Sequence, residues 1–432
     1  MAPAKAAVES AEARFIERNP KSKSFHDQAS NSLPGGNTRT PVWTSPFALR
    51  MERGFESNVW DVDGHKYTDF MGELAAGIYG HSHPIIREAM ISAFDTVGLS
   101  LGSTIVQEQR YAELLCSRFG LDLVRFSNSG TEANIHAING AKAFTGKNKV
   151  VVFGGAYHGS VLSFGDGRVA PQNWNKDDWV MGKYNDVQSA RKVIEDTSDL
   201  AAVLVEGMQG VGGCILGHVD FLQQVQESAK RVGAVFILDE IMTSRLAPGG
   251  LQSLLGLKPD MTTMGKHLGG GFAFGALGGR ADIMGVYDPR REGAVVHAGT
   301  FNNNTMTMSV GYAGLSRIFT PEVAAAFNAM GDKYRQKLQE VAKGTKCFFT
   351  GLGSFIAVHF ADQNVDDLAS VEDVEERWDL KDLFWFEMLE DGFWTTRRGV
   401  ISLMLPTPES EMDRFVACVG RFLERHGSIV AL

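Results

Sequence analysis

The sequence predicts an α/β protein with a mostly parallel sheet in a large domain and a smaller α+β domain formed by both ends of the chain. Between about residue 104 and residue 310, predicted helices alternate with short β-branched apolar runs, as in sheets whose parallel strands are joined by crossover helices. The segments before and after this region mix helices with isolated strands. A chain of 432 residues can also bury a large core without disulfides or a structural metal.

Each region of the chain has its own pattern. Residues 1–59, the first part of the predicted small domain, begin with a polar amphipathic helix, and just beyond them Asp63-Gly64 lies between alternating apolar residues, which predicts a β-hairpin. Residues 311–432, its second part, predict a long helix, two strands (FIAVHF and GVISLML) and a C-terminal helix. The large domain, residues 60–310, contains five predicted strands: LVRFSN, KVVVFGG, AAVLVEG, AVFILDE and MTTMGK.

Composition excludes several classes of function. The 42 basic and 51 acidic residues give a net charge of −9, and without a Lys/Arg run we expect no nucleic-acid partner. The four cysteines form no CxxC motif, which is typical of reduced thiols in a reducing compartment. The first 20 residues lack the apolar core of a signal peptide, and no uncharged stretch is apolar enough to span a bilayer. We therefore expect a cytoplasmic protein without a membrane partner.

Unusual polar residues follow the predicted strands directly. In an open parallel sheet, the crevice beyond the carboxyl ends of the strands is where ligands bind. We therefore expect these residues to converge on one site. They are the segment from Ser127 to Thr131, Tyr157 with His158, Glu206, Asp239 with Glu240, and Lys266.

The segment Ser129-Gly130-Thr131 opens a predicted helix. The free N–H groups and positive dipole of a helix N-terminus can hold a phosphate, assisted here by the two hydroxyls. Plain N-capping explains the same residues, with Thr131 as the cap and Glu132 complementing the dipole. Both interpretations stay open from these residues alone.

Asp239 and Lys266 carry the strongest chemical indications. Asp239 ends an apolar run that predicts burial, so its charge needs a cationic partner; a pyridinium nitrogen would serve, and so would an Arg or the backbone. Lys266 is flanked by glycines, and a Lys in a cleft titrates low enough to form a Schiff base with a carbonyl. Most lysines lie on the surface, but a solvated loop does not require the three glycines at 269–271.

Taken together and in order, five motifs resemble those of the class III aminotransferases, which are fold type I pyridoxal-phosphate enzymes. The resemblance covers nearly the whole chain, from GGNTRTP near residue 35 to TTRRG near residue 396, and it implies the fold type I architecture, pyridoxal 5'-phosphate as cofactor and a homodimer with its site at the subunit interface. The motifs are Ser129-Gly130-Thr131-Glu132, Tyr157-His158-Gly159, Asp239-Glu240, TMGK at 263–266 and HAGTFNNN at 297–304.

The resemblance also implies a role for each site residue. Lys266 and Asp239 would be catalytic, Lys266 by forming the Schiff base with the cofactor and Asp239 by pairing with its pyridine nitrogen. One departure is Gly207, where family members often have Pro after the Glu. The other cofactor-binding residues implied are Ser129, Gly130 and Thr131 at the phosphate, Tyr157 and Ile241 on the two ring faces, His158 beside Tyr157, Glu206 and Gln209 near the ring hydroxyl, and Thr300 from the second subunit.

For the reaction, the resemblance implies a ping-pong transaminase that moves an amino group from a β-amino acid or related amine donor to a 2-oxo acid. GGNTRTP and TTRRG are similar to segments of β-amino acid aminotransferases of the β-phenylalanine type, in which arginines at the positions of Arg39 and Arg398 hold carboxylates. Arg397, next to Arg398, is an alternative ligand.

Three other interpretations each explain part of the sequence. The segment TTMGKHLGGGFAFGALGGR also resembles glutamate-1-semialdehyde 2,1-aminomutase, although GGNTRTP lacks the Ser-Pro-Val-Arg typical of that enzyme. A non-catalytic cofactor-binding protein would have lost Lys266. A metal hydrolase using His81 and His83 lacks an evident third ligand, and Pro84 at the first position of a helix explains this segment structurally, so we expect no metal.

Overall fold

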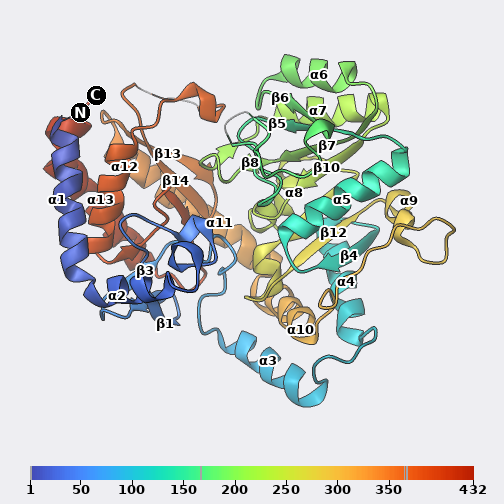
Figure 1. Ribbon diagram of the computed structural model, residues 1–432, viewed down its shortest axis with the longest axis horizontal. Helices are drawn as coiled ribbons and strands as arrows, with labels where there is room; N and C mark the ends of the chain where they lie inside the picture. Colours follow the sequence, from blue (N-terminus) through green and yellow to red (C-terminus); the bar gives the residue numbers. More distant parts are fainter. Residues whose placement is uncertain (1, 166–167, 364, 366–367) are drawn as a thin grey trace.

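The computed structural model describes residues 2–165, 168–363, 365 and 368–432. Figure 1 shows two lobes side by side. One contains the middle of the chain, and the other combines its first and last segments, with the two termini close together.

A seven-stranded sheet forms the centre of the large lobe. All five strands predicted for this region are present, and every strand runs parallel to the others except β12, which pairs antiparallel with both β11 and β4. The α/β architecture with a mostly parallel sheet is therefore the one that the sequence predicts. In spatial order, the strands are β4 (Leu123–Ser127), β12 (Gly275–Gly279), β11 (Met261–Gly265), β10 (Val235–Asp239), β7 (Leu200–Glu206), β5 (Lys149–Phe153) and β6 (Trp179–Gly182).

Helices cover both faces of this sheet, and the alternation of side chains along the strands explains why. In β10, Val235 and Ile237 pack in one buried cluster, which includes Ala137 of α5 (Gly130–Thr145). The intervening Phe236 and Leu238 pack in a second cluster with α6 (Val187–Asp196) and α7 (Val219–Val232). The other helices of this lobe are α3 (Pro84–Thr96), α4 (Val106–Phe119), α8 (Gly250–Leu255), α9 (Ala281–Met284) and α10 (Thr305–Ala313).

The small lobe contains two further sheets. In the first, β1 (Met51–Phe55), β2 (Asn58–Asp61) and β3 (Lys66–Asp69) join β15 (Phe393–Trp394), so both ends of the chain contribute. The predicted hairpin at Asp63-Gly64 connects β2 and β3, with Gly64 at a φ of 96°. The second sheet consists of β13 (Cys347–Leu352), β14 (Phe355–Phe360) and β16 (Val400–Ser402).

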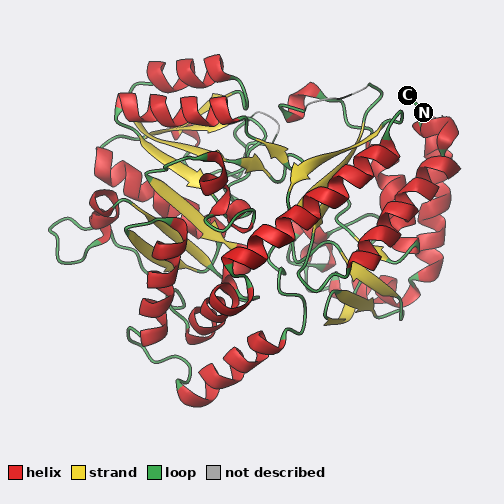
Figure 2. Ribbon diagram, turned by 180° about the vertical axis from the view of Figure 1, so that it is seen from behind, coloured by secondary structure: helices red, strands yellow, loops and turns green. Residues whose placement is uncertain are grey.

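Helices from both termini complete the small lobe. Helix α1 (Ala2–Arg18) packs along α12 (Trp378–Glu390), and α11 (Pro321–Ala342) packs on β13 and on α13 (Glu409–Arg425) (Figure 2). The expected division between residues 59 and 60 falls inside β2, and we propose that the lobe boundary follows β3, because β3 pairs with β15. The helices are α1 (Ala2–Arg18), α2 (Pro20–Ala29), α11 (Pro321–Ala342), α12 (Trp378–Glu390), α13 (Glu409–Arg425) and α14 (Gly427–Val430).

Two general properties follow from the coordinates. Within the described part of the chain, no helix is both long and apolar enough to cross a membrane. Cys116, Cys214, Cys347 and Cys418 are all free thiols.

Candidate active site

A cavity of about 340 Å³ lies between the lobes, at the carboxyl ends of the parallel strands. The structure brings together here the strand-end residues that the sequence singled out. Residues from the small lobe, Arg398 and Val400 among them, form the opposite wall. The charged and aromatic residues of the lining are Tyr157, His158, Glu206, Asp239, Lys266, Phe274 and Arg398.

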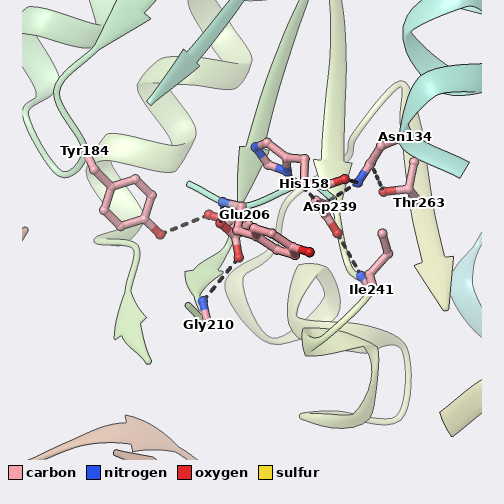
Figure 3. A network of polar contacts seen from close by, with 9 residues as sticks. Asn134, His158, Tyr184, Glu206, Gly210, Asp239, Ile241 and Thr263 are labelled. Atoms are coloured by element: carbon pink, nitrogen blue, oxygen red, sulfur yellow. Dashed lines mark hydrogen bonds and ion pairs between the residues drawn. The ribbon is translucent and has the colours of Figure 1, made fainter. Parts of the chain in front are cut away.

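Asp239 is the last residue of β10, and its carboxylate is held by three groups (Figure 3). Its Oδ2 lies 2.7 Å from His158 Nδ1 and accepts a hydrogen bond of 2.8 Å from Asn134 Nδ2, while Oδ1 accepts one of 3.0 Å from the Ile241 N–H. The side chain of Asn134 is itself fixed by Thr263, whose hydroxyl donates to its Oδ1 at 2.7 Å. The carboxylate is therefore fixed in orientation at the cavity wall.

Asn134 is a site residue that sequence reasoning missed. It lies on the buried face of α5 and is fully buried, and its Nδ2 also donates to the His158 carbonyl at 2.9 Å. The available signal was an amide within an otherwise apolar helix face, where a polar group needs partners.

Glu206 ends β7, the strand next to β10, and is held by backbone groups. Its carboxylate accepts hydrogen bonds from the Tyr157 N–H at 3.0 Å and the Gly210 N–H at 3.2 Å. Burial raises the pKa of Glu206 to about 7, although His158 and these N–H groups oppose the shift. Gly207 is the residue at which this sequence departs from the motif it resembles. A Cβ built there would lie 2.9 Å from Leu251 Cδ2, so a larger residue would be crowded.

Lys266 follows β11 directly, with a left-handed φ of 54°. Its Nζ donates a hydrogen bond of 2.8 Å to the carbonyl of Leu74. Burial lowers the pKa of Lys266, while Asp239 and Glu206 act in the opposite direction. Leu74 and Ala75, which line the cavity beside it, also have positive φ values, of 53° and 83°. Sequence reasoning did not identify this turn, because of its four consecutive residues with positive φ, Gly72 to Ala75, only the first is the glycine that such φ values favour.

The N-terminus of α5 faces the cavity through Gly130 and Thr131. Its N-cap is Ser129, whose hydroxyl accepts from the Glu132 N–H at 3.2 Å; the alternative in which Thr131 is the cap is wrong. A Cβ built at Gly130 would lie 2.6 Å from Ile241 Cδ1, so glycine lets Ile241 approach this helix end. The first N–H groups of the helix have no partner within it and can hold an anion.

Tyr157 and Ile241 both line the cavity, whereas two other predicted residues have different surroundings. Gln209 is fully buried and donates from Nε2 to the Gly154 carbonyl at 2.8 Å. Thr300 is exposed, in the loop that precedes α10.

The three candidate arginines differ clearly. Arg398 lines the cavity, and within the described residues its guanidinium has no hydrogen bond or ion pair. Arg397 is bound to both oxygens of Asp382, at 2.6 and 2.8 Å. Arg39 forms an ion pair with Glu73 at the surface. Of the two adjacent arginines, Arg398 is therefore the one available to a ligand.

The histidines considered as metal ligands have structural partners. His81 Nε2 lies 3.0 Å from Asp69 Oδ2, and His83 accepts from the Ile85 N–H at 3.2 Å at the start of α3, with Pro84 in its first turn. In the described ranges, no three His, Cys, Asp or Glu side chains gather as a metal site would require.

Comparison with known proteins decides the family. The sequence model of class III aminotransferases matches residues 40–408. The chain belongs to the class III aminotransferases. It is 45% identical over 421 residues to the β-phenylalanine transaminase of Variovorax paradoxus, covering 96% of each chain. It is 33% identical to a glutamate-1-semialdehyde 2,1-aminomutase of Heliobacterium modesticaldum, covering 81% of this chain and 84% of that one.

The solved structures agree with this assignment. The crystal structure of a β-phenylalanine aminotransferase from Variovorax paradoxus matches with a TM-score of 0.96 and 44% identity, covering 99% of each chain. Class III aminotransferases are pyridoxal-phosphate enzymes, and the cavity has the groups this cofactor needs: an amine of lowered pKa at Lys266, a fixed carboxylate at Asp239 and a helix N-terminus at Gly130.

Proposed function

We propose that this class III aminotransferase moves the amino group of a β-amino acid to a 2-oxo acid. The observation that carries the proposal is that Arg398 lines the same cavity as the Lys266 amine, with a guanidinium that has no partner among the described residues. A planar guanidinium binds a carboxylate through two parallel hydrogen bonds. The 45% identity to a β-phenylalanine transaminase supports the same class of donor.

The cofactor-binding roles are proposed from the lining of the cavity. Pyridoxal phosphate, when bound, supplies an electron sink for the carbanion that forms at the substrate carbon. The N–H groups of Gly130 and Thr131 would hold its phosphate, with Ser129 fixing the helix end that presents them. Asp239 would hold the proton on its ring nitrogen. Tyr157 and Ile241 would contact the two ring faces. The remaining proposed cofactor-binding residues are His158, Glu206, Gln209 and, from the second subunit, Thr300.

Lys266 is proposed as the base. Because burial lowers its pKa, a larger fraction of its amine is neutral near pH 7 and can take the proton from the substrate carbon. The Leu74 carbonyl, 2.8 Å away, keeps the amine within the cavity while it carries that proton. Donor and acceptor use this cavity in turn, which predicts ping-pong kinetics.

Arg398 would bind the carboxylate of whichever substrate occupies the cavity. Arg39 is proposed as a second carboxylate ligand, for which it must exchange its ion pair with Glu73. That exchange costs little, because ion pairs between exposed side chains contribute about 0–1 kcal/mol.

We also propose a homodimer in the cytoplasm. Apolar side chains gather at the surface of α3 and the segment after it: Met90, Ile91, Phe94, Leu99 and Leu101. The loop that carries Thr300 likewise exposes Val296 and Phe301. An apolar surface of this kind is typical of subunit interfaces. Four free thiols favour a reducing compartment.

The reaction is tested by incubating the holoenzyme with 3-amino-3-phenylpropanoate and either 2-oxoglutarate or pyruvate. We expect glutamate or alanine to accumulate, at a rate that depends on both substrates. The alternative is the intramolecular amino transfer of a glutamate-1-semialdehyde aminomutase, which the relative at 33% identity supports. Conversion of glutamate 1-semialdehyde without any added acceptor, together with no transfer from the β-amino acid, would contradict the proposal.

A further inference from the structure

A network of one half-buried and two buried charged or titratable side chains, Glu376, His359 and Lys381, lies in the small lobe close to the cavity wall. Glu376 Oε2 lies 2.9 Å from His359 Nδ1 of β14. It also accepts a hydrogen bond of 2.7 Å from Lys381 Nζ of α12, with which it forms an ion pair. His359 and Lys381 are 4% and 2% exposed. Burial by itself would raise the pKa of Glu376, but His359 and Lys381 outweigh it and hold the pKa below its usual value. Glu376 is therefore an ionised carboxylate that contacts both His359 and Lys381. Neither of these two side chains lines the cavity.

One arm of the network supports the turn that presents Arg398. Gly399, directly after it, has a φ of 88°, and a Cβ built there would lie 3.3 Å from Lys381 Cε and 2.6 Å from the Val358 carbonyl. The Gly399 carbonyl also accepts from the Val358 N–H at 3.0 Å. The backbone turn that carries Arg398 is thus packed against the aliphatic part of the Lys381 side chain and hydrogen-bonded to β14.

The other arm reaches the opposite wall. His359 Nε2 lies 3.1 Å from the carbonyl of Gly213, and a Cβ built on Gly213 would lie 2.4 Å from the imidazole. Gly213 follows Gly210 and Val211, which line the cavity. The imidazole therefore packs against the loop of the large lobe that contributes Gly210 and Val211 to the cavity, which Arg398 also lines.

We propose that Glu376 is a positioning residue for the carboxylate-binding end of the cavity. By holding Lys381 and His359 together, it fixes the Arg398 turn relative to the loop at Gly210 and thereby sets the selectivity for donors that carry a carboxylate. The inference rests on the proposed role of Arg398 in binding that carboxylate, and it adds a determinant that touches neither substrate nor cofactor.

The test compares two donors of the holoenzyme, 3-amino-3-phenylpropanoate and 1-phenylethylamine, which lacks the carboxylate. Glu376→Gln should raise the KM for the acid about fivefold or more, because contacting residues in one network couple by this order of energy. The kcat for the acid and the KM for the amine should stay within about twofold. The matched control is Glu375→Gln, which removes the same charge at the adjacent, exposed position; it should change neither.

Two further variants make the result decisive. In an Arg398→Ala background, Glu376→Gln should have no additional effect on the KM for the acid. If Glu376→Gln does not fold, Lys381→Met, which keeps most of the stem, should give the same pattern. The inference is overturned if Glu376→Gln changes the KM values for both donors equally, or changes neither, in an enzyme in which Arg398→Ala still raises the KM for the acid. If Arg398→Ala leaves that KM unchanged, the proposed role of Arg398 fails as well.

Discussion

Two buried carboxylates, Asp239 and Glu206, face the same cavity and differ in their partners. Asp239 has a histidine and an amide beside it, which hold its carboxylate in one orientation. Glu206 accepts from backbone N–H groups, and its pKa rises to about 7. The first carboxylate is fixed in orientation by its partners, and the second changes protonation near neutral pH.

The titration of Glu206 predicts a pH-dependent stability. Its folded pKa of about 7 lies above the ordinary 4.5, so the folded state keeps its proton longer and loses stability as the pH rises through 7. A shift of this size corresponds to roughly 3 kcal/mol. Glu206→Gln removes this titration. In the cofactor-free protein, the unfolding free energy of the variant relative to that of the wild type should therefore increase between about pH 5 and pH 8. Urea unfolding at both pH values measures this; two curves that change in parallel would refute it.

Adjacent residues show where the sequence could not decide between neighbours. Arg397 and Arg398 have the same side chain, and the choice between them depends on a turn with Gly399 at positive φ and on Asp382, contributed by α12. Sequence spacing contains neither fact. Lys266 and Asp239 could be singled out because each ends an apolar run, and the structure brings both to one cavity.

At the scale of elements, continuous apolar runs made five strands of the large sheet predictable. Among the elements that were not predicted, strand β12 and helix α12 were missed for physical reasons. Strand β12 has the sequence GALGG, whose glycines have low β propensity, and its place between β11 and β4 comes from packing. Helix α12 is buried over most of its length, so it lacks the polar face that would reveal a helix. Its aromatic run FWFEML belongs to the core.

The cap of α5 predicts a link between a helix end and cofactor binding. Ser129→Ala removes the acceptor of the Glu132 N–H and should lower the unfolding free energy by about 1 kcal/mol. Because the same helix end would hold the phosphate, the affinity for pyridoxal phosphate should also fall. Thermal unfolding and cofactor titration measure the two effects, and Ser129→Asp, which can still cap, is the matched control for stability. Unchanged stability would contradict the assignment of the cap.

At the scale of the whole molecule, the exposed apolar surface of α3 predicts the proposed dimer. Figure 1 shows α3 projecting from the large lobe. Phe94 is 59% exposed there. Phe94→Asp places a charge on this surface and should shift sedimentation from dimer toward monomer, with loss of activity because the site would lie at the interface. Glu88→Gln on the same helix is the control. A wild-type chain that sediments as a monomer would rule the dimer out.

The most direct test of the whole account is to find which lysine holds the cofactor. The holoenzyme is reduced with borohydride, digested, and mapped by mass spectrometry. We predict the added mass of the cofactor on the peptide that contains Lys266, and its loss in Lys266→Arg but not in Lys258→Arg, a change at an exposed lysine. A label on any other lysine, or no label on the wild-type enzyme, would contradict the account.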